Sequence, residues 1–303
     1  MSYRIECIPN VSTADPAILE RIAAAIEATE GVTLHFVDPG KSANRTVFTY
    51  LGPAVQVFKA TETLFEIALA HIDMREHKGV HPRMGAVDVC PFVLLDDHKF
   101  EEDLIGRTRA FAKRISTKHN LAIYGYEQLA DRPEHTNLAA VRKGEYEGLV
   151  ARFNTGDLPD FGPQSFDRSV ELQGATALSV RPLMVAYNVN LKGGTLEERL
   201  IAAKSIAKII RERDGGMPGV KAIGWYLPDL ELVQVSCNLT EPAKAGVCEV
   251  FAKVQILAEE MDFKAPSSEL IGCIPQSQFR SMGPEELGFG ELKSFDQKRI
   301  LNL

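Results

Sequence analysis

Hydrophobic residues at strand and helix spacing divide the first half of the chain into alternating elements. Ile18, Leu19, Ile22 and Ile26 recur at helical spacing, between a capping Asp15 and Gly31. A second helix begins near Pro53. Apolar runs predict strands over residues 3–8, 33–37, 46–51 and 86–93. The resulting order is β-α-β-β-α-β, extended by a helix near 99–119 and a strand over 121–126.

The same order returns in the second half. Strands are predicted over residues 183–191, 220–227, 230–239 and 269–274, with helices over 195–213 and 245–261. Repetition of this split-βαβ pattern predicts an α/β (α+β) protein of two tandem ferredoxin-like subdomains, residues 1–179 and 180–303. The bare sheet faces are expected to pack together around an interdomain cleft. Residues 131–174 have weak periodicity, and the tail after Ser281 is expected to be poorly ordered.

Composition narrows the classes of partner. The net charge is −7 and the sequence pI is about 5.6, with no basic stripe for nucleic-acid phosphates. The sequence contains no run of 18 apolar residues, so it predicts no membrane span. The five cysteines are widely spaced without a CxxC pair, which predicts neither a disulfide framework nor a thiolate zinc site. We therefore expect a reduced, cytoplasmic protein that takes small-molecule substrates.

The loop over residues 71–85 concentrates three histidines with basic and acidic residues. Three interpretations stay open: a solvated turn, a metal site, or a catalytic loop in which a histidine carries protons. A metal held by His77 and His81 is disfavoured, because Gly79 and Pro82 would break the helix that brings both rings to one face. The spacing does not decide which histidine acts.

Further polar groups have two interpretations each. The turn over 38–45 is a plain hairpin connection or a second polar cluster, and residues 162–166 and 173–176 form a linker or a site for a planar ligand. Asn188 and Asn190 alternate along one strand, so both amides face one side, toward a cleft or an exposed edge. Trp225 and Tyr226 are interpreted as core residues.

Ordered sequence blocks from residue 3 to about 280 resemble one family. They read ECIPNVS (6–12), NRTVFTY (44–50), HPRMGAVDVCPF (81–92), GEYEGL (144–149), PDFGP (159–163), GAT (174–176), AIGWYL (222–227) and QVSCNL (234–239). These blocks are similar to those of the formiminotransferase family, the folate-dependent glutamate formimidoyltransferases. The string beginning at His81 is highly specific.

The resemblance implies an enzyme of histidine degradation and one-carbon metabolism. Members transfer a formimino group from N-formimino-L-glutamate to tetrahydrofolate, their co-substrate, and release glutamate and 5-formiminotetrahydrofolate. It further implies a homodimer and a reaction without metal. The family's catalytic histidine falls on His81 and its acidic partner on Asp38. The folate-contacting stretch falls on Gly162, Pro163, Gln164, Ser165, Phe166, Asp167, Arg168 and Gly174. Candidates for binding substrate carboxylates are Lys41, Arg45, Lys78 and Arg83, and Asn188 and Asn190 are further binding candidates.

Two positions beside the expected site depart from the family pattern. Val80 stands where members carry Glu before the catalytic histidine, and Thr13-Ala14 stands where they carry Glu-Gly after the first strand. Two alternatives therefore accompany the transferase hypothesis. The chain could be a non-catalytic or repurposed folate- or anion-binding member, or a transferase for another formimino donor such as formiminoglycine.

Overall fold

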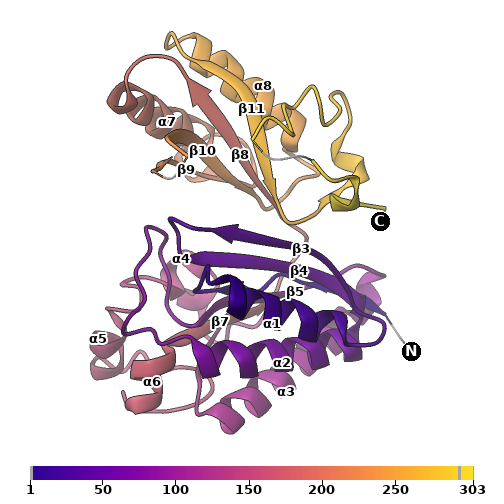
Figure 1. Cartoon of the computed structure of the whole chain (residues 1–303), viewed down its shortest axis with the longest axis vertical. Coiled ribbons are helices and arrows are strands. Elements are labelled where there is room, and N and C mark those ends of the chain that lie inside the picture. Colours follow the sequence, from indigo (N-terminus) through magenta and orange to yellow (C-terminus); the bar gives the residue numbers. More distant parts are fainter. Residues whose placement is uncertain (1–2, 229, 293–294, 303) are drawn as a thin grey trace. The chain divides into compact units, whose positions relative to one another are not determined.

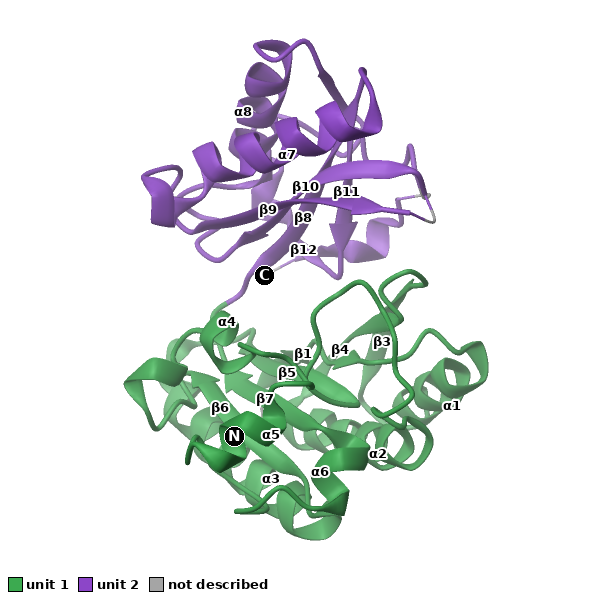
Figure 2. Ribbon diagram, turned by 90° about the vertical axis from the view of Figure 1, so that its left-hand side faces the viewer, with its two compact units in different colours: residues 1–182 green, residues 183–303 purple. Residues whose placement is uncertain are grey.

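A computed structural model describes residues 3–228, 230–292 and 295–302. The chain divides into two compact units, residues 1–182 and 183–303, and each is considered by itself (Figure 2). The predicted α/β class with two tandem units is confirmed. The division lies beyond the boundary predicted after residue 179, which would fall inside a strand. Packing of the two sheets around a cleft stays a prediction.

Unit 1 contains one twisted mixed sheet in which strands from distant parts of the chain are neighbours. Its strands are β1 (Arg4–Cys7), β2 (Asn10–Val11), β3 (Thr33–Gly40), β4 (Arg45–Pro53), β5 (Val87–Leu94), β6 (Ala122–Glu127) and β7 (Ala175–Val180). β1 and β2 both pair with β4 and β5, so they behave as one strand interrupted near Pro9. β3 pairs with β4 at one edge, and β5, β7 and β6 continue the sheet as parallel neighbours.

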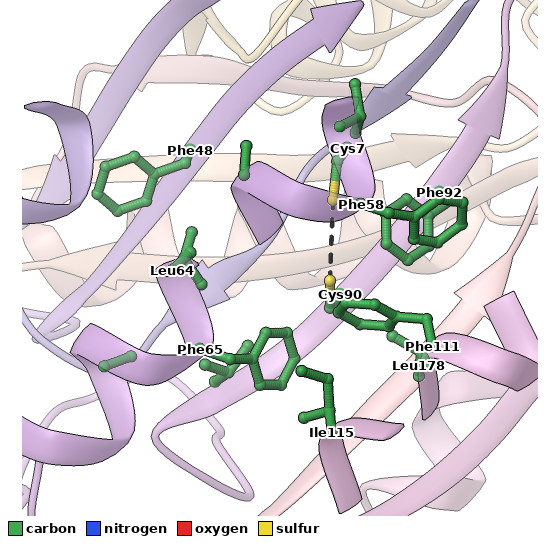
Figure 3. Close-up of a cluster of buried hydrophobic side chains, with 14 of the residues drawn as sticks. Cys7, Phe48, Phe58, Leu64, Phe65, Cys90, Phe92, Phe111, Ile115 and Leu178 are labelled. Carbon is green, nitrogen blue, oxygen red and sulfur yellow. Dashed lines mark hydrogen bonds between the residues drawn. The ribbon is translucent and has the colours of Figure 1, made fainter. Parts of the chain in front are cut away.

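Three long helices cover one face of this sheet: α1 (Pro16–Glu27), α2 (Ala54–His71) and α3 (Glu101–His119) (Figure 1). Asp15 caps α1 by accepting a hydrogen bond from the Ala17 N–H, and Pro16 occupies its first turn. Between helices and sheet lies a core of aromatic and aliphatic side chains, in which the sulfurs of Cys7 and Cys90 lie 3.8 Å apart (Figure 3). Burial raises the pKa of the Cys90 thiol, which disfavours the thiolate form.

The weakly periodic segment between β6 and β7 contains three short helices. These are α4 (Leu138–Val141), α5 (Leu149–Asn154) and α6 (Arg168–Gln173). Short 3₁₀ turns occur at His98–Phe100 and Pro133–His135 in this unit, and at Glu212–Asp214, Gln276–Gln278 and Gln297–Arg299 in the next. Phe153 of α5 and Val141 of α4 belong to a second small core that includes Tyr124 and Met84. The segment is therefore packed onto the sheet rather than being an open linker.

Unit 2 is a four-stranded antiparallel sheet with two helices on one face. Its elements are β8 (Val185–Lys192), α7 (Leu196–Ile210), β9 (Val220–Leu227), β10 (Leu232–Leu239), α8 (Val247–Glu259) and β11 (Lys264–Ile271), and the strand order is β11-β8-β10-β9. Thr195 and Glu198 form a capping box at the start of α7. Val185, Tyr187 and Val189 point into the core beneath α7 and α8.

The tail does not behave as its polar composition predicts. Leu287 and Phe289 are buried in the core of unit 2, and β12 (Ile274–Pro275) pairs in parallel with β13 (Ile300–Leu301). The expectation of a poorly ordered tail is therefore wrong for these residues, because their few apolar side chains are enough to attach them. Among the described residues, no helix is both long and apolar enough to cross a membrane.

Candidate functional site

A buried carboxylate holds the histidine-rich loop of unit 1 in place. Asp88, at the start of β5, is fully buried and accepts a hydrogen bond of 2.6 Å from the Met84 backbone N–H. It pairs with two guanidinium groups, those of Arg45 on β4 and Arg142 beyond α4, the second at 2.7 Å. Arg142 also donates to the carbonyl of Pro82, the residue after His81. Asp88 thus holds the residues that follow His81 in two ways: directly at Met84, and through Arg142 at Pro82.

His77 forms a second attachment and has no ring nitrogen left for a metal. The Arg83 Nε–H donates to its Nδ1 at 3.0 Å, so Nδ1 is the acceptor and the ring proton lies on Nε2. Nε2–H then donates to the Asn44 carbonyl at 2.7 Å. Burial lowers the pKa of His77, in agreement with a neutral ring. His77 therefore connects the loop to the β3–β4 turn instead of serving as a ligand.

The loop and the β3–β4 turn interlock through their backbones. The Val80 N–H donates to the Ser42 carbonyl at 3.0 Å, and the Asn44 side chain donates to the Lys78 carbonyl at 3.0 Å. Gly79 lies so close to the turn that an added Cβ would collide with the Ala43 carbonyl oxygen. Glycine is required here by this close approach, which brings the residues before His81 against the turn.

His81 is a half-buried imidazole held beside an excess of positive charge. Its Nδ1 lies 2.7 Å from the Pro82 carbonyl; because a carbonyl only accepts, Nδ1 carries the hydrogen and Nε2 the lone pair. Burial, reinforced by the charges of Arg45 and Arg142, lowers the pKa of His81 to about 4. Two guanidinium groups against the single carboxylate of Asp88 leave a net positive charge. The ring is therefore neutral at pH 7 and able to accept a proton.

The four basic candidates for substrate carboxylates divide into two pairs. Arg45 is buried against Asp88, and Arg83 donates to both oxygens of Glu147 at 2.6 and 2.7 Å. These two arginines already have carboxylate partners within the chain, which gives them a positioning role. Lys41 and Lys78 are exposed on the interlocked turn and loop. They remain the basic side chains of this set that face solvent.

Asp38 lies near the end of β3, in register with Val47 of β4. Phe48 and Tyr50 of β4 point into the core beneath the helices, so Val47 and its partner Asp38 face the opposite side of the sheet. The side chain is 8% exposed. Its position on the hairpin that interlocks with the histidine loop is compatible with a role beside His81, and that pairing stays a prediction.

Comparison with known proteins shows the family to which the chain belongs. The model of the formiminotransferase domain, N-terminal subdomain, matches residues 4–181, and that of the formiminotransferase domain matches residues 186–284. The chain belongs to the formiminotransferase family. It is 37% identical over 278 residues to glutamate formimidoyltransferase of Streptococcus pyogenes, covering 91% of this chain and 90% of that protein. It is 33% identical over 301 residues to glutamate formimidoyltransferase of Thermoplasma acidophilum, covering 98% and 95%.

Other members of the family are longer proteins. Formimidoyltransferase-cyclodeaminase of Dictyostelium discoideum is 38% identical over 283 residues, which cover 91% of this chain and 51% of that protein. The chain thus spans about half the length of the formimidoyltransferase-cyclodeaminases it matches.

In this family member, the stretch predicted to contact folate is joined to the histidine loop at one end. Gly174, at φ +69°, forms a bridge with Gly85, and the Gln173 carbonyl accepts from the Ala86 N–H at 2.8 Å. At the other end Gly162, at φ +103°, packs so closely on the Leu121 carbonyl that a Cβ would not fit. Both glycines therefore serve backbone packing as well as any ligand.

Between these glycines the side chains differ in availability. Pro163 is buried, whereas Gln164 and Ser165 are exposed, and Phe166 packs edge-on against a ring of α5. Asp167 caps α6, and Arg168 pairs with Glu171 one turn later. The last two polar groups are thus engaged within the segment itself.

In unit 2 the two predicted amides do share a face. Asn188 and Asn190 alternate with the core residues Tyr187 and Val189, which places both amides on the side away from α7 and α8. The interpretation of Trp225 as a core residue is wrong, because its side chain is only half-buried and its indole N–H bonds to Gln234 on that same face. Two further residues beside His81, Asp88 and Arg142, are not among those that the sequence predicts for the site.

Proposed function

We propose that the chain is a glutamate formimidoyltransferase that moves the formimino group of N-formimino-L-glutamate to N5 of tetrahydrofolate. The observation that carries the proposal is the neutral, half-buried His81, held on an interlocked loop beside net positive charge. End-to-end similarity to two proteins of that name supports it. The family's bifunctional members support the class of reaction rather than any further activity of this chain.

The reaction needs a group that accepts one proton and returns it. As N5 attacks the formimino carbon, Nε2 of His81 takes the N5 proton and a tetrahedral intermediate forms. Collapse of that intermediate breaks the bond to the glutamate nitrogen, which receives the proton back from His81. The Arg45–Asp88–Arg142 cluster contributes by keeping the ring neutral before substrate binds. Substrate carboxylates would offset its excess charge and make the ring a stronger base.

The residues present fit the two substrates. Lys41 and Lys78 supply exposed cations for the carboxylates of either glutamate moiety. Gln164 and Ser165 supply exposed polar groups in the stretch that the family resemblance assigns to folate. A formimino group is readily protonated and is then electrophilic by itself, so we expect activity without metal. A homodimeric, cytoplasmic enzyme of histidine degradation is likewise expected from the resemblance and stays a prediction.

Incubation of the purified chain with formiminoglutamate and tetrahydrofolate tests the proposal. We expect glutamate and 5-formiminotetrahydrofolate to form in equal amounts. A parallel reaction with formiminoglycine tests the donor, because faster turnover there would assign the activity to a different transferase. Binding of tetrahydrofolate without turnover of either donor would contradict the proposal and support a folate-binding protein instead.

A further inference from the structure

The carbonyl oxygen of Pro82 connects the ring of His81 to the guanidinium group of Arg142. It accepts the Nδ1–H of His81 at 2.7 Å, and it also accepts a hydrogen bond from Nη2 of Arg142. The same Nη2 donates to Oδ2 of the fully buried Asp88 at 2.7 Å. One nitrogen atom of Arg142 thus links a buried carboxylate to the carbonyl that bonds the His81 ring.

The position of Arg142 is set by the fold of its own segment. Its side chain is 14% exposed, and the preceding residue, Val141, is fully buried in the small core of α4 and α5. Four residues further on, the Tyr146 N–H donates to the Arg83 carbonyl at 2.9 Å, which attaches the segment to the histidine loop a second time. The guanidinium group is therefore held from both sides along the chain, and it does not depend on His81 for its place.

The partner of Nδ1 decides which nitrogen of a neutral imidazole carries the hydrogen. Because a carbonyl oxygen only accepts, Pro82 selects the tautomer of His81 that has Nδ1–H and the lone pair on Nε2. In many sites of proton transfer a carboxylate orients the histidine in this way. A backbone carbonyl can do the same only while its peptide plane keeps the oxygen next to the ring. The hydrogen bond from Arg142 opposes rotation of that peptide plane.

We propose that Arg142 is a positioning residue for His81, which holds the Pro82 carbonyl at Nδ1 and thereby keeps the lone pair of the ring on Nε2. This inference rests on the proposed function, since Nε2 is the atom that takes the proton from N5 of tetrahydrofolate. Arg142 itself contacts no reacting atom in this role. The assignment adds a residue from the segment between β6 and β7 to the acidic partner, Asp38, that the family resemblance implies.

Arg142 also acts on the ring through its charge. Burial is the main cause of the low pKa of His81, and the largest charge effects on the ring come from Arg45 on β4, Arg142 beyond α4 and Asp88 on β5. The two arginines lower this pKa, and Asp88 raises it. Loss of the Arg142 charge would remove one lowering effect and leave the Asp88 carboxylate with a single arginine partner. Both changes raise the pKa of His81, whereas loss of a merely structural residue would leave it in place.

Nuclear magnetic resonance of the histidine rings tests this role in the protein without substrate. Ring carbon and nitrogen shifts distinguish the two neutral tautomers, and His81→Asn identifies the His81 signals among the 7 histidines of the chain. At pH 7 we expect the wild-type ring to be almost entirely the Nδ1–H tautomer. In Arg142→Gln, whose amide is too short to reach both acceptors, the Nε2–H tautomer that free histidine prefers should become a major form. An unchanged tautomer in folded Arg142→Gln would overturn the proposal.

Turnover and its pH dependence supply the second test. Arg142→Gln should lower kcat about tenfold, with the KM for tetrahydrofolate within about threefold, because Arg142 orients the base and does not bind the substrate. The acid limb of kcat/KM should move up by about 0.5–1 pH unit, as expected for loss of one nearby charge. Arg142→Lys should keep most of the wild-type kcat, because both acceptors are bonded by one nitrogen, Nη2, which an ammonium group can replace.

Arg132→Gln is the matched control. Arg132 lies in the same segment and pairs with Asp157 and Asp160, so its loss can lower stability but should leave the tautomer of His81 and the acid limb unchanged. An equal change in the two variants would show that Arg142 supports the fold alone, and would overturn the proposal.

The failure of this inference can be told apart from failure of the proposed function. A folded Arg142→Gln protein with the wild-type tautomer, kcat and acid limb would refute the role of Arg142 and leave the transferase assignment intact. A wild-type chain without transferase activity, in which Arg142→Gln still changes the tautomer, would refute the transferase and leave the positioning of His81 standing. If Arg142→Gln does not fold, Arg142→Lys decides: retention of the Nδ1–H tautomer would support the proposal, and its loss in the folded variant would overturn it.

Discussion

Val80→Glu restores the acidic residue that the family pattern places before the catalytic histidine, and the structure predicts its effect. The Val80 side chain is 57% exposed, and the backbone N–H of the residue donates to the Ser42 carbonyl. Valine at this position therefore fills no packing gap. A glutamate would keep the backbone bond and place its charge in solvent next to His81, so we expect the thermal midpoint to change by no more than about 2 °C.

The new charge should raise the pKa of His81. Two charged groups on neighbouring residues lie roughly 6–8 Å apart, and at an effective dielectric of about 40 their attraction is about 1 kcal/mol. An attraction of about 1 kcal/mol corresponds to about 0.7 pH unit, and screening of an exposed carboxylate reduces it. The acid limb of kcat/KM should therefore move up by about 0.3–0.7 pH unit from its starting point near pH 4. A stronger base should also increase turnover at pH 7 by about twofold.

The assay is the ratio of kcat/KM between variant and wild type from pH 3.5 to 8. Because the substrates ionise identically in both reactions, the ratio isolates the change at His81. Val80→Gln has the same size without the charge and should leave the limb where it is. An unshifted limb in Val80→Glu, or an equal shift in Val80→Gln, would refute the electrostatic reasoning, and a large drop in thermal midpoint would show that the site is more enclosed than its exposure indicates.

Three further predictions concern the residues that support the site. Gly79→Ala should reduce kcat at least tenfold, because its Cβ would collide with the Ala43 carbonyl. Gly106→Ala is the control and should leave kcat unchanged, because there is open space around that position. Equal effects of the two substitutions would contradict the interlocking of loop and turn. His77→Asn removes a ring that is hydrogen-bonded at both nitrogens, and it should lower the free energy of unfolding in urea by about 1–3 kcal/mol. Its turnover should fall less than that of His81→Asn. Unchanged stability would show that His77 does not hold the loop against the β3–β4 turn. Burial raises the pKa of Glu6 to about 7, so the folded protein loses stability as the pH rises from about 4.5 to 7. Glu6→Gln should therefore be more stable than wild type at pH 8, by at most about 3 kcal/mol, and equally stable at pH 4. A variant that is less stable than wild type at pH 8 would contradict this reasoning.

Patterning is informative where one face of an element is buried and the other is not. The strands and helices of both split-βαβ units follow from alternation and helical spacing, as does the shared face of Asn188 and Asn190. The sequence pattern does not predict β7. This strand lies between two parallel neighbours and is buried on both faces, so its residues show no alternation of apolar and polar side chains. The orientation of Trp225 escapes for a related reason, since its strand segment is a continuous apolar run.

The site depends on pairings between residues that are remote in sequence. Arg142 lies in the weakly periodic segment, 54 residues from Asp88, and no local spacing connects the two. The spacing along the chain also does not distinguish His77 from His81. In the folded chain, the hydrogen bond from Arg83 engages the His77 ring, and His81 is the histidine left for the proposed role of proton carrier. The family resemblance points to His81 as the catalytic histidine, but it says nothing of the charge on the ring. The neutral state of His81 follows from its burial and from the charges of Arg45 and Arg142, which only the folded chain brings together.

The kcat of His81→Asn with formiminoglutamate and tetrahydrofolate tests the central claim most directly. A residue that carries the transferred proton contributes about 10²–10⁴-fold to the rate, so the variant should lose at least a hundredfold in kcat while folic acid binding stays within about threefold of wild type. Retention of a third or more of the wild-type kcat would contradict the assignment of His81 as the proton carrier.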